Sequence, residues 1–591
     1  MDYLKSVVPS QLMSERGSNL VVINPGSANI RIGLASQDTP FNIPHCIARH
    51  TKQVPKKNVQ DQMLNNQLTT AQHMEREKAY DVIASLLKIP FLDEEPSSNS
   101  FPRKMGRVDG QNPQTSRKDL ALTWTNVYEE ASSSSSAVEP SRNEDATTES
   151  LDLKECTDSK EHVREQKFRE FICGEEALRI SPTEPYCLCR PIRRGHLNIS
   201  QHYPMQQVLE DLRTIWDWIL IEKLHIPRNE RNMYSVVLVI PETFDNREIK
   251  EMLSIVLQEL CFGSAVVHQE GIAAVFGNGL STACVVNMGA QVTSVICIED
   301  GVALPATGKT LPFGGEDISR CLLWTQRQHQ TWPQIRTDML SKPIDLLMLN
   351  RLKETYCEIK EGELDATAVV HSYEDGTSAG SHKTRLTALN VPPMGFFYPT
   401  LLVPDVFPPP PRSWFHDYED MLEDTWHIDF PRRPDMSDGF YPNANVGLSM
   451  WESYPVFPNK PKKEEKVGIA EAVTNSILST GRIDLQRKLF CSIQLIGGVA
   501  QTRGLVPAVE ESVLHAIPPN EAVDTVEVLQ PRANPTFVPW KGGAILGVLD
   551  FARDAWLHRE DWIRNGIHIG SGRKYKDSYY IQGQAMCYIN S

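Results

Sequence analysis

The sequence has little that would anchor, export or cross-link the chain. It holds no apolar run of about 18 residues, the length that crosses a bilayer, and residues 1–17 lack the apolar core and cleavage site of a secretory signal. Its 12 cysteines are scattered and include no CxxC pair. We therefore expect no membrane span, no zinc ribbon and no disulfide framework, and a reducing compartment, either nucleus or cytosol.

The balance of charge and hydrophobicity limits the function classes further. Asp and Glu number 75 against 60 Lys and Arg, which gives a net charge of −15 at pH 7. An acidic chain is a poor general binder of DNA, although a local basic patch is compatible with this total. With 40% hydrophobic residues among 591, the chain can form several domains or one large two-lobed fold.

Two short Gly-containing segments carry most of the information that is present. Residues 20–35 and 283–301 each read as an apolar strand, a tight turn with Gly and a second strand. Backbone N–H groups in such a turn can face a phosphate. Strands and helices alternate elsewhere, as around the buried-strand run 234–240, which indicates an α/β layered sheet. The repeat predicts a duplicated α/β fold with a nucleotide cleft between its halves.

Changes in composition predict where the halves and their insertions lie. The first insertion holds a predicted helix near 70–87 and a Ser-rich acidic stretch, 129–163, that we expect to be disordered. The predicted organisation is an N-terminal arm, 1–17; the start of the first lobe, 18–50; an insertion, 51–167; the rest of the first lobe, 168–280; the second lobe, 281–402; an acidic, aromatic and Pro-rich insertion, 403–466; and the end of the second lobe with a return to the first, 467–591.

The second insertion has the composition of a partner-binding segment. Prolines and acidic residues alternate with eleven aromatic residues over 403–466, which favours a binding strap over a purely solvated linker. Lys460, Lys462 and Lys463 near its end are a candidate nuclear-import patch, although two glutamates adjoin them.

Nine short motifs in a fixed order resemble those of actin and the actin-related proteins. The resemblance covers 18–50 and 168–590. It implies an actin-like, duplicated two-lobed fold, shared with chaperone ATPases and sugar kinases, with a central nucleotide cleft and two long insertions. The motifs, in chain order, are VVINPGSANIRIG, PIRRGHLN, VLVIPETF, VVHQEGIAAVFGNGLS, VVNMGAQVTSV, LPFGGEDISRCL, LKETYCEI, LIGGVAQTRG and WKGGAIL.

Both turns supply groups that suit a nucleotide phosphate. Gly26 and Ser27 offer N–H and hydroxyl donors, Arg31 adds a positive charge toward the phosphates, and Gly289 and Gln291 lie in the opposing turn. The competing interpretation is that the glycines only turn the chain. Since two turns occur together with further motifs of the family, we favour ATP as a weak or structural ligand.

The resemblance extends this predicted site to the base and the ribose. It places Lys353 and Glu354 on a helix beside them and Phe537 near the adenine. It also places Gly497 and Gly498 in a loop where the backbone approaches the nucleotide.

The turns lack the carboxylates that phosphate chemistry needs to hold a metal ion and position water. The resemblance aligns the family's metal-associated Asp residues with Ile23, Asn287 and Ala290. The family's water-orienting Gln aligns with Glu270, although a shift of the alignment by one residue would place Gln269 at that position. Bound Mg²⁺ is therefore doubtful, and we expect that the chain is not an enzyme.

Two titratable groups near the turns have a catalytic and a structural interpretation. His268 could act beside Glu270, but a buried His at a strand end is the simpler interpretation. Asp317 could pair with Glu316 in acid–base chemistry, but a role at a helix N-terminus is the simpler one. We favour the structural interpretation for both.

The resemblance implies a function in assembly. It points to a nuclear structural subunit of a chromatin-remodelling complex that binds a long helix of the remodelling ATPase, actin and other actin-related proteins, and contacts histones or nucleosomal DNA. The insertions would obstruct the head-to-tail contact of polymerising actin, so no homopolymer is expected. The alternatives are an active ATPase or kinase of the same superfold, and a cytoplasmic cytoskeletal actin-related protein.

Overall fold

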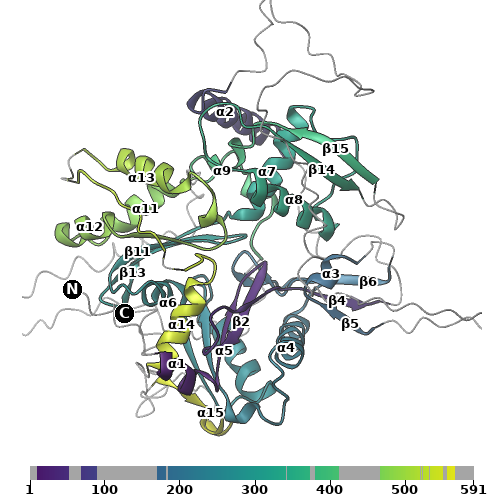
Figure 1. The fold of residues 1–591 in the computed structure, drawn as a ribbon, viewed down its shortest axis with the longest axis vertical. Coiled ribbons are helices and arrows are strands. Elements are labelled where there is room, and N and C mark those ends of the chain that lie inside the picture. Colours follow the sequence, from purple (N-terminus) through teal and green to yellow (C-terminus); the bar gives the residue numbers. More distant parts are fainter. Residues whose placement is uncertain are drawn as a thin grey trace, which may run out of the picture.

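The chain forms two lobes, each built on its own β-sheet (Figure 1). No helix among the described residues is long and apolar enough to cross a membrane. The computed structural model describes residues 10–51, 68–89, 169–180, 184–340, 342–372, 380–410, 466–519, 521, 523–531, 533–549 and 555–565.

A six-stranded sheet forms the centre of the first lobe. Its strands, from one edge to the other, are β17 (Leu557–His558), β10 (Ser264–Gln269), β9 (Ser235–Ile240), β1 (Leu20–Pro25), β2 (Asn29–Leu34) and β3 (Phe41–Pro44). β1 and β2 pair antiparallel, and β1 also pairs in parallel with β9. Because β1 is covered on both faces, it reads as a continuous apolar run.

The second lobe repeats this arrangement. Its sheet has the order β13 (Val302–Leu311), β12 (Thr293–Glu299), β11 (Ala283–Met288) and β16 (Ile493–Ile496). β11 pairs antiparallel with β12 and in parallel with β16, as β1 does with β2 and β9. The predicted duplication of an α/β unit is therefore confirmed.

Two helices cross closely where the lobes join. α6 (Glu270–Gly277) contacts strands of both sheets, and α14 (Val538–Val548) packs on it. A Cβ on Gly542 would lie 1.6 Å from the Ala273 carbonyl oxygen, and a Cβ on Gly277 would lie 2.4 Å from that of Val538. Gly542 of the WKGGAIL motif and Gly277 of the VVHQEGIAAVFGNGLS motif therefore permit a close backbone crossing where the lobes join.

Smaller elements complete each lobe. The first lobe adds β4 (Ile47–His50), β5 (Phe171–Cys173), β6 (Tyr186–Cys189), β7 (Ile192–Arg193), β8 (His196–Leu197), α1 (Ser10–Gly17), α3 (Glu175–Leu178), α4 (Met205–Glu222), η3 (Arg231–Met233), α5 (Asn246–Ser254), η4 (Ile255–Glu259) and α15 (Arg559–Asn565). The second lobe adds α7 (Gly315–Gln328), α8 (Pro343–Tyr356), β14 (Ala366–Ser372), β15 (Gly380–Leu386), α9 (Val391–Met394), η5 (Pro404–Val406), α11 (Ile469–Leu478), α12 (Ile483–Phe490), η7 (Val499–Gln501) and α13 (Leu505–Ala516).

One helix of the first insertion packs on the second lobe. α2 (Thr70–Leu86) begins at a capping box and confirms the helix predicted in this part of the chain. The Arg76 guanidinium lies 4.1 Å from the centre of the Trp324 ring, and the Tyr80 hydroxyl lies 2.7 Å from His329 Nε2. The insertion thus contributes a helix to the lobe that it does not interrupt (Figure 1).

Several predictions concern residues outside the described ranges. The predicted disordered stretch, 129–163, lies outside them, as does the candidate import patch with Lys460, Lys462 and Lys463. Of the second insertion, the structure describes only 403–410 and residue 466.

Candidate functional site

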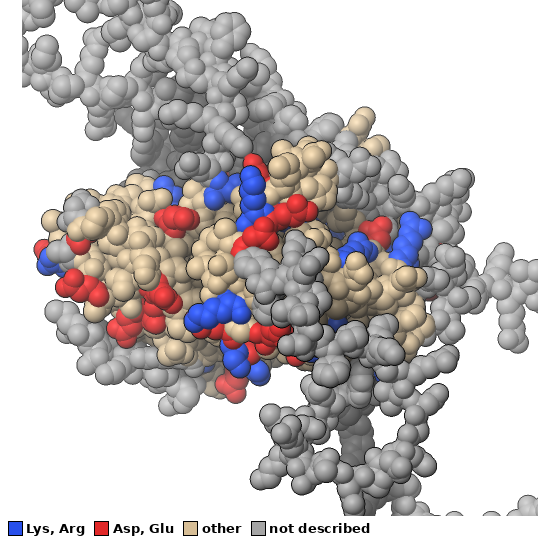
Figure 2. Space-filling model, turned by 90° about the horizontal axis from the view of Figure 1, so that it is seen from above, with Lys and Arg blue, Asp and Glu red and all other residues tan. Residues whose placement is uncertain are grey.

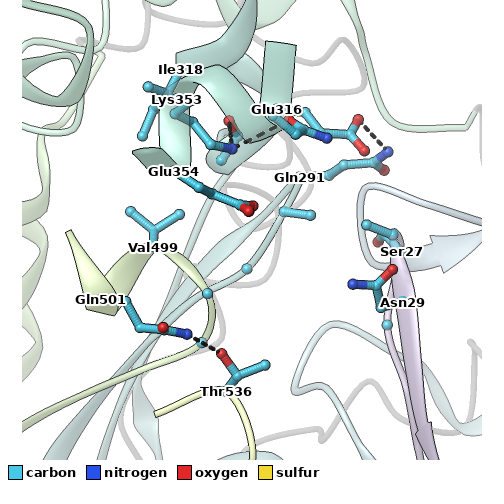
Figure 3. Close-up of a pocket in the computed structure, with 18 of the residues that line it drawn as sticks. Ser27, Asn29, Gln291, Glu316, Ile318, Lys353, Glu354, Val499, Gln501 and Thr536 are labelled. Carbon is cyan, nitrogen blue, oxygen red and sulfur yellow. Dashed lines mark hydrogen bonds between the residues drawn. The ribbon is translucent and has the colours of Figure 1, made fainter. Parts of the chain in front are cut away.

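A cavity of about 570 Å³ lies between the lobes, and both Gly-containing turns line it (Figure 3). This volume is typical of small-molecule sites. Phe537 is not among the lining residues, whereas its neighbour Thr536 is. The structure therefore brings together nine of the ten predicted site residues: Gly26, Ser27, Arg31, Gly289, Gln291, Lys353, Glu354, Gly497 and Gly498.

The first turn is tight and presents a hydroxyl to the cavity. The Gly26 N–H donates to the Asn29 carbonyl at 3.0 Å, and a Cβ on Gly26 would lie 2.7 Å from that same oxygen. The Ser27 hydroxyl oxygen accepts a hydrogen bond of 3.2 Å from the Gly195 N–H. Because Ser27 accepts there, its hydroxyl proton is left to donate to a ligand anion.

The second turn lies beside the end of β16, and it too depends on close backbone contacts. The Gly289 N–H donates to the Val292 carbonyl at 2.9 Å. Gly497 has a φ of +90°, and a Cβ there would lie 2.4 Å from the Met288 carbonyl oxygen. Only Gly fits this approach, so Gly497 has a structural role that is independent of any ligand.

Gln291 lines the cavity, but its amide is engaged by protein groups. Its Oε1 accepts from the Arg194 N–H at 2.8 Å, and its Nε2 donates to Glu316 at 2.9 Å. Figure 3 shows the Gln291 amide directed at Glu316. Gln291 therefore connects protein segments at the edge of the cavity instead of offering its side chain to a nucleotide.

The opposite wall carries both charged residues that the resemblance placed near the base and ribose. Lys353 Nζ donates to the Gly315 carbonyl at 2.9 Å and lies 3.3 Å from Asn350 Oδ1. Burial lowers the pKa of Lys353. The Glu354 carboxylate points into the cavity (Figure 3). Glu354 is therefore the freer of the two for contact with a ligand hydroxyl.

Gln501 and Thr536 close the side of the cavity nearest to α14, and neither was among the predicted site residues, although Gln501 lies within the LIGGVAQTRG motif. Gln501 Nε2 donates to the Thr536 hydroxyl at 2.7 Å, and the pair faces the cavity in Figure 3. Phe537, which the resemblance places near the adenine, occupies the N-cap position of α14 without a side-chain capping hydrogen bond.

The structure corrects the assignment of the first metal-associated position. Ile23 is fully buried in the apolar core, because alternate side chains of β1 point to opposite faces. The next residue, Asn24, faces the cavity side instead, and its Nδ2 donates to Glu270 at 2.6 Å and to the Val239 carbonyl at 2.9 Å. The residue at the family's first metal-associated position is thus Asn24, an amide, and not the aliphatic Ile23. Neither residue supplies a carboxylate.

Glu270 is a carboxylate held between two amides. Asn24 donates to one of its oxygens and Asn287 Nδ2 to the other at 2.5 Å. Burial is the main cause that raises the pKa of Glu270, to about 7, and the nearby Glu242 raises it further. Arg31 and the amides act in the opposite direction. At neutral pH this carboxyl group is therefore partly protonated.

These residues do not fit a tightly held Mg²⁺ ion. Magnesium prefers several oxygen ligands in octahedral geometry, usually with carboxylates. Both oxygens of Glu270 are already occupied by amide N–H groups, and Ala290 contributes no ligand. No group of three or more His, Cys, Asp or Glu side chains in the described ranges is placed to hold a metal ion.

The two titratable groups with competing interpretations have structural roles. His268 is buried at the end of β10, and burial lowers its pKa to about 4, so the ring is neutral. Asp317 accepts from the Gly314 N–H at 2.8 Å in the first turn of α7 and pairs with Arg194 at 2.6 Å. Neither residue lines the cavity.

Comparison with known proteins places these features in a family. The family model described as Actin matches residues 79–573. Actin-related protein 9 of Oryza sativa subsp. indica is 61% identical over 597 residues and is covered, like this chain, over 100% of its length. Actin-related protein 9 of Arabidopsis thaliana is 62% identical over 592 residues, which cover 100% of this chain and 98% of that protein.

More distant relatives have the same fold. Actin-related protein 8 of Salmo salar is 26% identical over 614 residues, which cover 93% of this chain and 90% of that protein. The structure of human actin-related protein Arp8 in its ATP-bound state has a TM-score of 0.65 and 24% identity, over 95% of this chain and 97% of that chain. The actin-like fold predicted from the nine motifs is therefore confirmed.

Proposed function

Since the chain belongs to the actin family, we propose that it is a non-polymerising structural subunit of a nuclear chromatin-remodelling complex. In this proposal it binds ATP weakly or as a structural ligand and does not hydrolyse it efficiently. Its partners are a long helix of the remodelling ATPase, actin and other actin-related proteins, and histones or nucleosomal DNA.

One observation carries the part of the proposal that concerns chemistry. The carboxylates of a metal-dependent phosphate site are replaced by Asn24, Asn287 and Ala290. Glu270, the carboxylate beside these amides, accepts hydrogen bonds from both of them, and burial raises its pKa to about 7, so that it is only partly ionised at neutral pH. A site of this composition attracts a divalent ion weakly, which argues against efficient turnover.

The cavity nevertheless suits a nucleotide. The Gly26 and Gly289 turns both line the cavity, and Ser27 and Arg31 add a hydroxyl donor and a positive charge. ATP bound there would have its phosphates between the turns and its ribose toward Glu354. The ATP-bound state named for the human Arp8 structure supports this ligand by analogy.

The face of the molecule drawn in Figure 2 gives little support for nucleic-acid contact. On the face seen from above the second lobe, basic and acidic side chains alternate without a large patch of one sign (Figure 2). DNA binding depends on clustered positive charge, so the described side chains of this face do not support the proposed DNA contact.

The test is affinity purification of the tagged full chain from nuclear extract, with identification of bound proteins by mass spectrometry. The same purification from cytosolic extract is the control. We expect a remodelling ATPase, actin and other actin-related proteins in the nuclear sample only. Recovery of cytoskeletal proteins from cytosol alone would overturn the nuclear assignment and favour the cytoskeletal alternative.

The catalytic part is tested on the free protein. We expect no ATP turnover above the no-protein blank in the presence of Mg²⁺, and no increase in light scattering on addition of salt and ATP. Steady Mg²⁺-dependent turnover would instead support an active ATPase or kinase, and filaments seen by microscopy would contradict the non-polymerising assignment.

A further inference from the structure

A short hairpin of the first lobe reaches across to the second lobe beside the cavity. This hairpin, residues 191–198, contains β7 and β8, and we call it the latch hairpin. It is fixed to its own lobe by two hydrogen bonds of 2.7 Å, from the Thr243 hydroxyl to the Gly195 carbonyl and from the Leu197 N–H to Glu248. The latch hairpin therefore moves with the first lobe.

Arg194, at the tip of the latch hairpin, is buried against the second lobe. Its two terminal nitrogens donate to the two carboxylate oxygens of Asp317 at 2.6 and 2.8 Å, and both side chains are 1% exposed. Its Nε donates to the Phe407 carbonyl at 2.7 Å, and a terminal nitrogen also donates to the Gln291 carbonyl. A bidentate pair with this many satisfied donors is a strong and geometrically specific contact.

Two further ion pairs join the lobes near this contact. Arg190, which precedes the latch hairpin, lies 3.1 Å from Glu316 in α7. Arg351 in α8 lies 3.2 Å from Glu175 in α3. The positive residue belongs to the first lobe in one pair and to the second lobe in the other. The closed position of the lobes is thus held at several points by protein groups alone.

The latch hairpin also contacts both Gly-containing turns. The Gly195 N–H donates to the Ser27 hydroxyl oxygen of the first turn, and the Arg194 N–H donates to Gln291 of the second turn. The two turns are therefore bridged at the mouth of the cavity by a segment that needs no phosphate between them.

We propose that the latch hairpin holds the two lobes closed over the cavity when no nucleotide is bound. A ligand then enters and leaves only when Arg194 separates from Asp317, which makes exchange slow and suits a ligand with a structural role. The identity of that ligand rests on the proposed function, whereas closure of the empty cavity does not.

The test is hydrogen exchange, followed by mass spectrometry, on the full chain free of nucleotide. Arg194→Met removes the contact with Asp317. Arg385→Met is the matched control, because Arg385 pairs with Asp365 in an exposed position within the second lobe. We expect exchange in the turns, residues 24–31 and 286–294, to rise at least tenfold in R194M and less than twofold in R385M.

The same experiment contains the results that would overturn the proposal. Equal exchange of the turns in R194M and the unsubstituted chain would do so. Free exchange of the turns in the unsubstituted chain, with protection appearing only after ATP is added, would also do so. Exchange in α4, a helix of the first-lobe core, shows in each case whether the variant is folded.

R194M leaves the buried Asp317 carboxylate with one cation fewer, which could prevent folding. A second variant therefore tests the proposal without this uncompensated charge. The double variant Arg194→Met with Asp317→Asn removes both charges, and Asn can still accept from the Gly314 N–H. We expect the same tenfold rise in exchange from it, and release of a fluorescent ATP analogue at least tenfold faster than from the unsubstituted chain. If the analogue binds none of these proteins, the proposal that ATP is the ligand is contradicted. Hydrogen exchange in the nucleotide-free protein still tests whether the latch hairpin holds the lobes closed.

Discussion

At the scale of single residues, Glu270 makes a pH-dependent contribution to stability. In the folded protein its pKa is raised from 4.5 to about 7 by burial and by Glu242. Between these two values the native state binds a proton that the unfolded chain has already released. The stabilisation from this proton is therefore complete below about pH 4.5 and is lost as the pH rises through about 7. We expect Glu270→Gln to reduce the loss of unfolding free energy between about pH 5 and about pH 8 by about 1–3 kcal/mol, measured by urea unfolding.

The control for this prediction is Glu361→Gln, because Glu361 is exposed and its side chain is 68% accessible in its pair with Lys88. Its pH profile is expected to parallel that of the unsubstituted chain. If E270Q has the same pH profile as E361Q, the carboxyl group of Glu270 is not protonated in the folded state at neutral pH.

Gly497 gives a second prediction at this scale, because two features exclude a side chain there. Its φ is +90°, and a Cβ would lie 2.4 Å from the Met288 carbonyl oxygen. Gly481 has a φ of +67° with nothing within 4 Å of a Cβ, so it is the matched control. We expect Gly497→Ala to lower the free energy of unfolding by about 2–3 kcal/mol and Gly481→Ala by about 1 kcal/mol. Equal losses would mean that backbone conformation alone sets the cost.

Single-residue predictions from the sequence succeeded where the motif itself fixes the geometry. Gly26 and Gly289 lie in tight turns whose first and second strands are apolar, so their place at the cavity follows from local pattern. Ile23 was misassigned because a shift of one residue along a strand moves a side chain to the opposite face. Thr536 lines the cavity and its neighbour Phe537 does not, and a loop has no periodicity from which this choice could be predicted.

At the scale of elements, α2 shows what a local pattern cannot determine. Its capping box and helical spacing are local signals, and the predicted helix is confirmed. Its packing on the second lobe depends on contacts with residues such as Trp324 and His329, about 250 positions away along the chain. No periodicity in the sequence records such a partner, so the lobe on which α2 packs could not be predicted.

The packing of α2 leads to a prediction with a matched pair of neighbouring positions. Ile83 is fully buried in the core of the second lobe, whereas Val82 is 49% exposed. We expect Ile83→Ala to lower the free energy of unfolding by about 2–4 kcal/mol, because it leaves a cavity, and Val82→Ala to change it by less than about 0.5 kcal/mol. Chemical denaturation measures both. Similar small effects would mean that α2 contributes little to the stability of the second lobe.

At the scale of the whole molecule, the duplicated architecture could be predicted because its two hairpins repeat in the sequence, 20–35 and 283–301. The contact between the two lobes could not be predicted from the sequence. Arg194 and Asp317 are 123 positions apart, and the sequence shows them only as one Arg of a PIRRG segment and one acidic residue in a helical first turn. Their pairing became apparent only when both lobes were placed around one cavity.

The arrangement of the whole cleft leads to a prediction about its ligand. Since Asn24, Asn287 and Ala290 provide no carboxylate, ATP is expected to bind through the turns without needing a metal ion. At an ATP concentration of about 100 times its Kd, binding would stabilise the folded chain by about 2.7 kcal/mol. For a protein of this size we expect a rise in Tm of about 1–3 °C, equal with Mg²⁺ and with excess EDTA.

Two serines provide the matched variants for this last measurement. Ser27 lines the cavity with its hydroxyl proton free to donate, whereas the hydroxyl of Ser254, the last residue of α5, donates to Gln258 of η4 away from the cavity. Loss of one hydrogen bond to an anion weakens binding by about 1.5 kcal/mol or more, roughly tenfold, so Ser27→Ala is expected to need about ten times more ATP for the same rise in Tm. Ser254→Ala should behave as the unsubstituted chain does. If EDTA abolishes the rise, a metal ion takes part in binding, and the amides around Glu270 must then rotate to present their oxygens to it.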